Sequence, residues 1–358
     1  MLKFLIQRTF AGGLVLLGVI VVIFLLLNII PINAEQLSVG QNTDEATILA
    51  TKKKLRLNYS PAKRLWYYVS DLSPVSIQSH SDEDAPLSLL SGDYNYLIIY
   101  QGARKSLILK QAYFGRSFQS DKPVLQILSK KALPTAILAL TAITLASVVG
   151  IVLGLFSALN YGKTIDRLLV SISVIGISIP SYFSALLLAI IFGFYLSNYT
   201  HLNITGPLID ISDLGEYFIN WKNLILPTIA LGIRPVAIIL QLTRNSMLDV
   251  LSADYIRTAT SKGLSRKVVI LKHALRNALN PVVTSITGWF AALLAGAFFV
   301  EYIFDFKGLG HETVNALTMF DFPVVMGAVL LIAFVFVLVN ILVDILYSML
   351  DPRIRIDE

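Results

Sequence analysis

Six long apolar runs, separated by polar segments, constrain the fold of this 358-residue chain more than any other feature. The runs cover residues 10–30, 132–161, 168–196, 224–243, 281–302 and 323–350. A helix of about 20 apolar residues crosses a hydrocarbon layer about 30 Å thick, so each run is long enough to span a membrane. Backbone polar groups in lipid must find their partners inside the segment, which favours helices. We therefore predict an all-α polytopic membrane protein with six transmembrane helices.

The charges of the connections predict the orientation of these helices, because short connections rich in Lys and Arg stay in the cytoplasm. The basic pairs are Lys3 with Arg8 before the first run and Lys163 with Arg167 after the second. Acidic residues predominate in the segments 198–222 and 301–323. We expect both termini in the cytoplasm, residues 31–131 outside between the first two helices, and residues 351–358 as a cytoplasmic tail.

The first third of the chain is predicted to hold one helix and an extracytoplasmic insert. The first run is longer than the apolar core of a secretory signal peptide and lacks a small-residue cleavage site, so residues 1–30 should remain as a transmembrane helix. In the insert, residues 55–72 are predicted to form an amphipathic helix and residues 79–86 a polar linker. Residues 94–100 and 106–110 have the Ile, Leu and Tyr content of two short strands.

The connection over residues 244–280 is strongly cationic. Its seven basic residues are Arg244, Arg257, Lys262, Arg266, Lys267, Lys272 and Arg276. Only two carboxylates, Asp249 and Asp254, stand against them. This excess of positive charge predicts a cytoplasmic position.

The same connection has the pattern of two helices separated by a glycine. A short helix is predicted to begin at Asp254, whose carboxylate suits a helix N-terminus, and to end at Gly263. Its partly apolar face consists of Tyr255, Ile256 and Ala259. Ser265 can cap a second helix over residues 266–278, before Pro281 opens the next span. Two short helices held at a membrane surface are suited to docking onto another protein.

The sequence DYIRTATSKG over residues 254–263, followed by VVILKHALRNALNPVVT, resembles the cytoplasmic loop of ABC-importer permeases. The similarity is closest to the first permease subunit of the dipeptide/oligopeptide class. In that family a helix of this loop inserts into a groove of the ATPase subunit and transmits its closure. The resemblance implies ATPase coupling by Asp254, Tyr255, Arg257, Thr258, Ala259, Lys262 and Gly263. A basic loop that only sets topology is the alternative.

Within this resemblance, Gly263 takes the position of the family motif's glycine and Ala259 that of its second alanine. Arg257 stands where the general motif has glutamate, and Thr258 where it has its first alanine. These departures are typical of the peptide branch.

The resemblance extends over most of residues 115–358 and, more weakly, the first helix. The similar segments are IDRLLV, GISIPSY, FVEYIFDFKGLG, DFPVVMGAVLL and VNILVDILYSMLDPRIR, in the family's order. Residues 29–33, IIPIN, depart from the usual LPGDP. The resemblance implies the type I ABC-importer permease fold, with a five-helix core over residues 132–350.

The resemblance also implies partners in a bacterial inner membrane: a second homologous permease, two cytoplasmic ATPase subunits and an extracytoplasmic solute-binding protein. The part of the insert over residues 75–110 is longer than is usual in the family. It is either a lineage-specific surface insertion or a contact for the binding protein. Whether the two permeases are identical is left open.

Motifs for chemistry within the chain itself are incomplete. GKT at residues 162–164 resembles the end of a phosphate-binding loop, but Ser157 stands where such a loop needs glycine. HETVN at residues 311–315 begins like a zinc motif but has Asn315 in place of the second histidine. The chain has no cysteine and no clear catalytic grouping. We expect no enzyme activity, cofactor, metal site or nucleic-acid partner.

Two charged residues fall inside the predicted spans, where a charge is costly. Arg234 lies ten residues before Arg244, which is about 15 Å along a helix and near the middle of the bilayer. It either faces the transport pathway, where it attracts an anionic group such as a peptide carboxylate, or pairs with a carboxylate of another span or subunit. Asp344 occupies the family's VDxLY position, which favours a role in helix packing.

The resemblance therefore implies the permease subunit of an ATP-driven importer for peptides or similar small solutes. A permease for a non-peptide solute, such as nickel or glutathione, is an alternative within the family. A stand-alone secondary transporter or channel is an alternative from another class. Residues that line the pathway and the substrate itself do not follow from one sequence.

Overall fold

The computed structural model describes residues 2–29, 58–80, 95–212 and 215–350. The chain divides into two compact units. The first consists of Met1–Lys130 with Thr313–Phe334, and the second of Lys131–Glu312 with Val335–Glu358. Three predicted features fall outside the described residues: the start of the insert after the first helix, most of the polar linker 79–86, and the tail 351–358.

Four described helices are long and apolar enough to cross a membrane. They are α1 (Leu2–Ile29), α5 (Val124–Leu159), α9 (Lys222–Leu251) and α15 (Phe322–Leu350). A fifth candidate is a bent pair, α6 (Thr164–Ser178) followed by α7 (Ser181–Leu188) with the π-helix η2 (Ala189–Tyr195). The predicted fifth run falls on α12 (Leu275–Gly296) and the short α13 (Phe298–Ile303). The mostly helical fold is thus confirmed.

The bend in the third predicted run is far larger than a kink. The axes of α6 and the α7–η2 segment differ by 105°. Both Ile179 and Pro180 have extended backbones, with ψ of 125° and 140°. Proline lacks an N–H and disfavours helical geometry in the residue before it, so the chain leaves the helix at this point. The predicted span over 168–196 therefore consists of two helical segments, which are separated by a break at Pro180.

Two further helix boundaries differ from the predictions. The fourth span does not end at Thr243, because α9 continues two turns further to Leu251. Pro281 does not open a new helix either. The chain runs from α11 (Arg266–Val268) through the π-helix η3 (Val269–Ala274) into α12, with Pro281 inside it. A proline removes one backbone hydrogen bond of a helix. In a packed bundle, neighbouring helices and local π turns can supply other partners for the freed carbonyl, so the helix continues.

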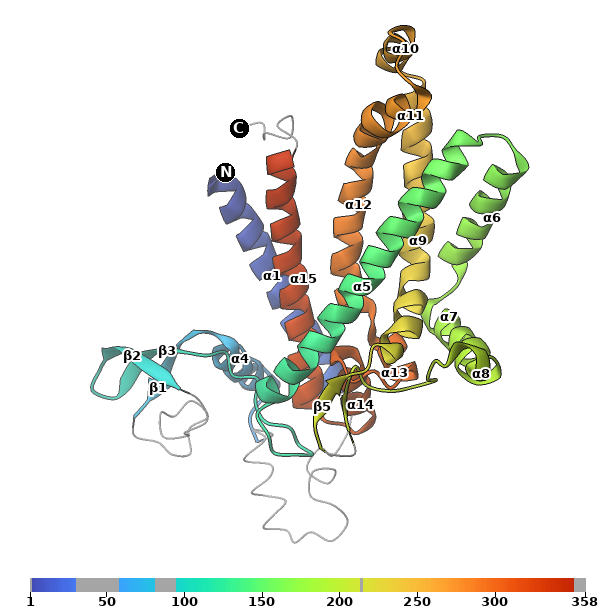
Figure 1. Ribbon diagram of the computed structural model, residues 1–358. Helices are drawn as coiled ribbons and strands as arrows, with labels where there is room; N and C mark the ends of the chain where they lie inside the picture. Colours follow the sequence, from blue (N-terminus) through green and yellow to red (C-terminus); the bar gives the residue numbers. More distant parts are fainter. Residues whose placement is uncertain (1, 30–57, 81–94, 213–214, 351–358) are drawn as a thin grey trace. The chain divides into compact units, whose positions relative to one another are not determined.

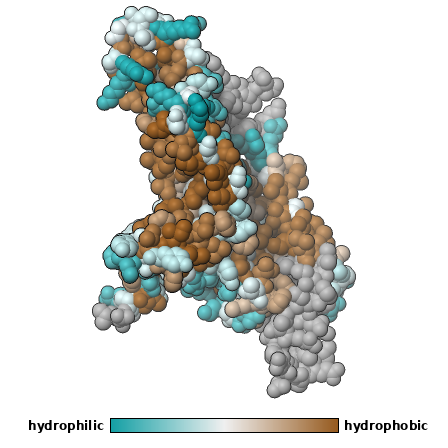
Figure 2. Space-filling model, turned by 90° about the vertical axis from the view of Figure 1, so that its right-hand side faces the viewer, coloured by the Kyte–Doolittle hydropathy of each residue, from teal (hydrophilic) through white to brown (hydrophobic). Residues whose placement is uncertain are grey.

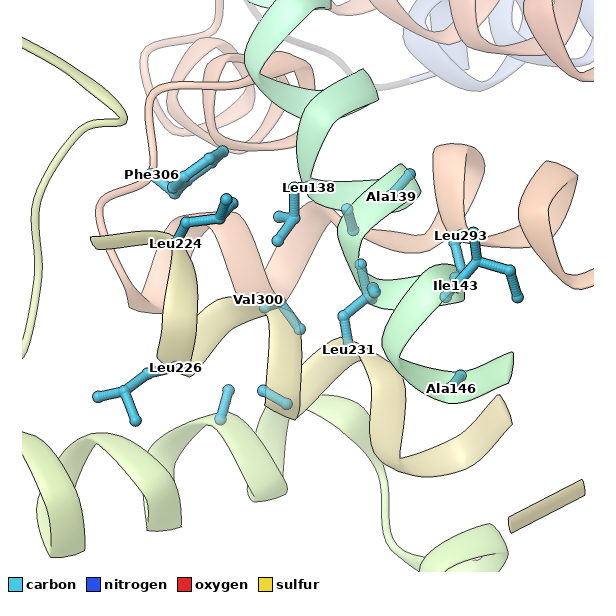
Figure 3. Close-up of a cluster of buried hydrophobic side chains, with 14 of the residues drawn as sticks. Leu138, Ala139, Ile143, Ala146, Leu224, Leu226, Leu231, Leu293, Val300 and Phe306 are labelled. Atoms are coloured by element: carbon cyan, nitrogen blue, oxygen red, sulfur yellow. The ribbon is translucent and has the colours of Figure 1, made fainter. Parts of the chain in front are cut away.

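The second unit has its apolar core between α5, α7, α9, α12 and α13. Figure 3 shows most of the labelled side chains pointing toward one another from these helices. Small residues let α5 and α9 approach closely, as at Gly150 and Gly154 of α5. A Cβ at Gly154 would lie 2.6 Å from the carbonyl oxygen of Leu240 and 2.7 Å from Cβ of Thr243. The two backbones are therefore in direct contact along one side of α5.

The first unit contains a small sheet that the sequence predicted in part. After α4 (Pro61–Leu72) come β1 (Val75–Ser79), β2 (Tyr96–Gln101) and β3 (Lys105–Lys110). They form an antiparallel sheet in the order β1-β3-β2. The strands β2 and β3 are confirmed, and the helix predicted over 55–72 is present but begins at Pro61, whereas β1 was missed.

The second unit holds the remaining short elements. They are α8 (Ser197–Thr200), the hairpin of β4 (Ile209–Ile211) and β5 (Tyr217–Ile219), and α10 (Asp254–Ser261). The helix α14 (Leu309–Thr318) belongs partly to each unit. These elements make the fold helical with two small sheets instead of purely α.

We expect Gly154→Ala to lower the free energy of unfolding by about 1–3 kcal/mol, because the new methyl group would overpack the contact with α9. Thermal unfolding of the detergent-solubilised protein measures this loss. Gly288→Ala in α12 is the matched control, since a Cβ there meets no atom within 4 Å. A Gly154→Ala protein as stable as the Gly288→Ala protein would contradict the close contact between α5 and α9.

Candidate functional site

The predicted docking segment lies at one end of the second unit. In Figure 1, α10 stands beyond the ends of α9 and α12. Figure 2 shows hydrophilic side chains gathered over α10 and α11, next to the apolar surface of the adjoining helices. The structure thus places the basic connection as a polar cap on an apolar bundle.

The helix α10 begins and ends where the sequence predicted. Ala253 before it is extended, and Asp254 opens its first turn, where a carboxylate favours the unpaired N–H groups. The N–H of Lys262 still donates to the carbonyl of Thr258. Gly263 then takes a φ of +79°, which ends the helix because other residues rarely adopt this geometry.

The inner face of α10 is fastened by two small apolar contacts. Ile256 and Ala259 are buried in one cluster with residues of α5, α9, η3 and α12. Their fully or largely buried partners are Ala158, Met247, Val269, Ala274 and Ala278. Asn277 adds a hydrogen bond, because its Nδ2 donates to Tyr255 Oη at 3.0 Å. α10 is therefore packed against the helices that lead into the bundle.

The outer face of α10 is open to solvent. Asp254 and Arg257 are almost fully exposed, and their 3.5 Å ion pair contributes little at such a site. Thr258, Lys262 and Gly263 are exposed as well. The neighbouring exposed residues combine apolar with basic side chains: Leu264, Val268, Leu271, Arg266, Lys267, Lys272 and Arg276. Of the seven predicted coupling residues, only Ala259 faces inward, and a mixed apolar and cationic surface remains free.

A buried ion pair joins two helices beside this cap. Arg244 of α9 donates to both carboxylate oxygens of Asp166 in α6, at 2.7 and 2.9 Å. Asp166 also accepts from Ser157 Oγ at 2.5 Å and from the N–H of Gly162 at 2.9 Å. The Arg244 guanidinium lies 5.3 Å from the ring centre of Tyr161. A bidentate pair with the carboxylate fully hydrogen-bonded fixes both helices in one geometry.

The sequence did not predict this ion pair. Arg244 stood out only as one of seven basic residues of its connection. The two residues are 78 positions apart, so no local pattern connects them. Their only common signal is that opposite charges end two predicted spans on the same side of the membrane.

Together, the ion pair and the apolar cluster connect six elements. The cluster joins α10 to α5, α9, η3 and α12, and the ion pair adds α6. A displacement of α10 therefore reaches several long helices through packed side chains and a charged hydrogen-bond network. This arrangement is suited to transmitting motion, and it has no grouping of residues for a chemical reaction among the contacts described.

Arg234, the first of the two charged residues inside the predicted spans, lies away from α10. Arg234 is 17 residues from the end of α9, which is about 25 Å along a helix. Its guanidinium lies 6.0 Å from the ring centre of Trp289 on α12, and the side chain is exposed. In the part of the chain that the structure describes, no carboxylate lies within ion-pair distance of it. Asp344 is half-buried in α15.

A second buried carboxylate organises the segment after α12. Glu301 is fully buried and accepts from Thr135 Oγ1 at 2.7 Å and from the N–H groups of Gly310 and His311 at 2.7 and 3.1 Å. It thereby holds the first turn of α14 against α5 and α13. The sequence singled out His311 only as half of an incomplete zinc motif.

His311 has a different partner in the structure. Its Nε2 lies 2.8 Å from Asp305 Oδ1. Burial lowers the pKa of His311 and nearby Lys307 adds to this, although Asp305 acts in the opposite direction. Among the described residues, no group of three potential metal ligands comes together.

Comparison with known proteins places this geometry in context. Residues 150–356 match the family model described as "Binding-protein-dependent transport system inner membrane component". Residues 1–88 match the model for the N-terminal part of binding-protein-dependent transport membrane components. The first match alone covers more than half of the chain.

Two curated relatives match along nearly their whole length. The dipeptide transport system permease protein DppB of Alkalihalophilus pseudofirmus is 32% identical, with 99% of this chain and 100% of the relative covered. The glutathione transport system permease protein GsiC of Salmonella typhimurium is also 32% identical, with 99% of both chains covered. A solved amino acid ABC transporter chain aligns with a TM-score of 0.44 and 17% identity over 63% of this chain and 94% of that one, which is too distant to carry an argument.

We expect Arg244→Met to lower the free energy of unfolding by about 3 kcal/mol or more, because it leaves the Asp166 carboxylate buried without its cation. The double variant Asp166→Asn with Arg244→Met should recover most of the loss, as measured by thermal unfolding in detergent.

Arg257→Met, which removes an exposed arginine, is the control for that experiment and should leave the stability unchanged. Equal stability of the Arg244→Met and Arg257→Met proteins would contradict the structural importance of the Asp166–Arg244 pair.

Proposed function

The chain belongs to the family of binding-protein-dependent transport system inner membrane components, and from this premise we propose how it works. It is a multi-pass permease subunit of an ABC importer of the peptide type, and not an enzyme. The proposal is that ATP hydrolysis on separate ATPase subunits drives its transport cycle through α10.

The proposed topology has six spans. They are α1, α5, the bent α6–α7 pair, α9, α12 and α15, in a type I permease fold with the core over residues 132–350. Both termini would be cytoplasmic, on the same side as the basic residues around α10, and residues 31–131 would be extracytoplasmic. The concentration of Lys and Arg at the α10 end supports this orientation.

The proposed coupling element is the exposed face of α10. Asp254, Tyr255, Arg257, Thr258 and Lys262 would enter a groove of an ATPase subunit. Inward-facing Ala259 and the turn at Gly263 would hold the helix at the required angle. The observation that carries this proposal is that α10 is open outside and packed inside, next to a buried ion pair between two long helices. Closure of the ATPases would then move packed helices as a unit, which changes access to the pathway.

The proposed assembly contains a second homologous permease, two ATPase subunits and an extracytoplasmic binding protein. Association with ATPase and binding-protein partners follows from the family, whereas this composition is our proposal. A stand-alone transporter or channel is not favoured, because the chain is similar along its whole length to permeases named as parts of transport systems.

The proposed substrates are peptides or similar small solutes. The similar relatives are named for dipeptide and glutathione transport, and both solutes carry carboxylates. We place Arg234 on the pathway as an attractor for such a group. Its exposure in the middle of α9, with Trp289 beside it, supports this position. Asp344 would help to fix α15 within the bundle.

Purification of the tagged chain in mild detergent should recover a homologous permease and two ATPase chains, with ATPase activity that substrate-loaded binding protein stimulates. We expect Ala259→Asp, which places a carboxylate in the apolar cluster, to abolish both transport and stimulated ATP hydrolysis. Ala259→Ser should retain both. A chain that purifies alone and transports in liposomes without ATP would overturn the coupling proposal.

Gly263 offers a second pair of variants for the same assay. Gly263→Val forces a β-branched side chain into a φ of +79° and should uncouple the complex. Gly263→Asn should retain most activity, because asparagine enters this region more readily. Equal loss in both variants would show that the backbone geometry is not the cause.

We expect Arg234→Gln to reduce uptake of substrates with a free carboxylate more than uptake of their amidated analogues. Arg234→Lys, which keeps the charge, should reduce it less. The measurement is uptake of paired peptide acids and amides into proteoliposomes that contain the whole complex. Unchanged uptake of both substrate forms would remove Arg234 from the pathway.

A further inference from the structure

The small sheet of the first unit exposes one face that is made of apolar side chains. Partners in an antiparallel sheet point to the same face, so the register of β1, β3 and β2 defines two faces. One of them, which we call the apolar face, consists of Val75, Ile77, Leu97, Tyr100, Leu107 and Leu109.

The apolar face is open. Leu97 and Tyr100 are 70% and 69% exposed, and Ile77 is 59% exposed. The residues form two adjacent rows across all three strands, so the exposure is continuous and not a set of isolated side chains. A large continuous apolar surface on a protein marks a site that interacts with a membrane, another protein or a ligand.

The opposite face holds buried polar side chains around the fully buried Ile108, and Tyr96 and Ile98 on its β2 strand are exposed. Ser76, Gln78, Ser106 and Lys110 all lie on it with little exposure. Lys110 Nζ donates to the backbone carbonyl of Asp71 at the end of α4, and Ser106 Oγ lies 2.6 Å from His80 Nε2. Lys110 and Ser106 therefore have partners inside the unit, and the side chains of the apolar face point outward. Alternation of this kind suits a sheet whose outer face does not meet water.

Helix α4 holds the sheet close to the end of a membrane helix. It packs against α1, where the Arg64 guanidinium lies 6.0 Å from the ring centre of Phe24. Phe24 is close to the end of the apolar part of α1, Ile6–Leu26. Only two residues separate α4 from β1, so the sheet is held near the level at which α1 leaves the hydrocarbon layer.

The apolar face has a basic border at one end, and an exposed tryptophan lies on the preceding helix. Lys105 stands in the next row of the same face, opposite Ser79, and the exposed Arg104 precedes it in the turn between β2 and β3. Trp66 on α4 is 67% exposed. Lys and Arg next to apolar surface keep their charges at the level of anionic headgroups, and Trp and Tyr are enriched at the same depth.

We propose that the apolar face lies on the membrane surface, with Val75, Ile77 and Leu97 among the acyl chains. Arg104 and Lys105 contact the phosphates of anionic lipids. The sheet thus anchors the insert to the bilayer beside α1. This proposal goes beyond the transport function, and it depends only on α1 crossing the membrane.

The chain has no cysteine, so single labels test the proposal in the full-length protein. Ile77→Cys and Leu97→Cys are each labelled with an environment-sensitive fluorophore, and the protein is reconstituted in nanodiscs. Ser120→Cys, exposed in the polar turn of the same unit, is the control. We expect lipids with brominated acyl chains to quench the labels at 77 and 97 much more strongly than the label at 120, and aqueous iodide to show the reverse order.

Two outcomes would overturn the proposal. In one, iodide quenches the labels at 77 and 97 as readily as the label at 120. In the other, these labels become shielded only when a binding protein is added, which would make the apolar face a protein-docking surface.

A variant with Arg104→Gln and Lys105→Gln tests the charge contribution. In the unmodified background, quenching at position 97 should increase with the fraction of anionic lipid. In the double variant this dependence should be lost. Equal dependence in both backgrounds would remove Arg104 and Lys105 from the lipid contact.

Discussion

The bidentate ion pair between Asp166 and Arg244 is the constraint on which the α10 end of the molecule depends. A buried charge without a partner is costly, so neither helix can move away from the other without breaking the pair. Ser157 and Gly162 occupy the rest of the carboxylate's hydrogen-bonding capacity. α10 rests on the apolar cluster beside this pair, and its outer face is left for a partner. Helices fixed to one another by the Asp166–Arg244 pair, next to an exposed face of α10, are what the proposed mechanical coupling requires.

Other close contacts between distant segments occur elsewhere in the second unit. Gly150 and Gly154 bring the backbone of α5 onto α9, and buried Glu301 holds α14 to α5 and α13 through Thr135 and two backbone N–H groups. Each of these contacts joins segments that are distant in the sequence. Contacts of this kind are what the proposed transmission of a displacement along the helices requires.

Local patterns in the sequence predicted what local physics determines. The limits of α10, the turn at Gly263 and the strands β2 and β3 were all placed correctly. The Asp166–Arg244 pair was missed because it depends on the packing of distant helices. Pro281 was misjudged because tertiary contacts and π turns outweigh the usual effect of proline. β1 was missed because its exposed apolar residues have meaning only next to β3. The function came from a resemblance of whole segments, which spacing alone would not have supplied.

The central claim is that α10 and the turn before α6 move as one body when the ATPases close. Its most direct test is a spin-label distance between Lys163→Cys and Ser261→Cys, two exposed positions, in the assembled complex. The distance should be the same without nucleotide and with ATP bound, while ATP changes the side of the membrane from which the transport pathway is accessible. A distance that changes with ATP would show that α10 moves independently of the Asp166–Arg244 junction and would contradict the account.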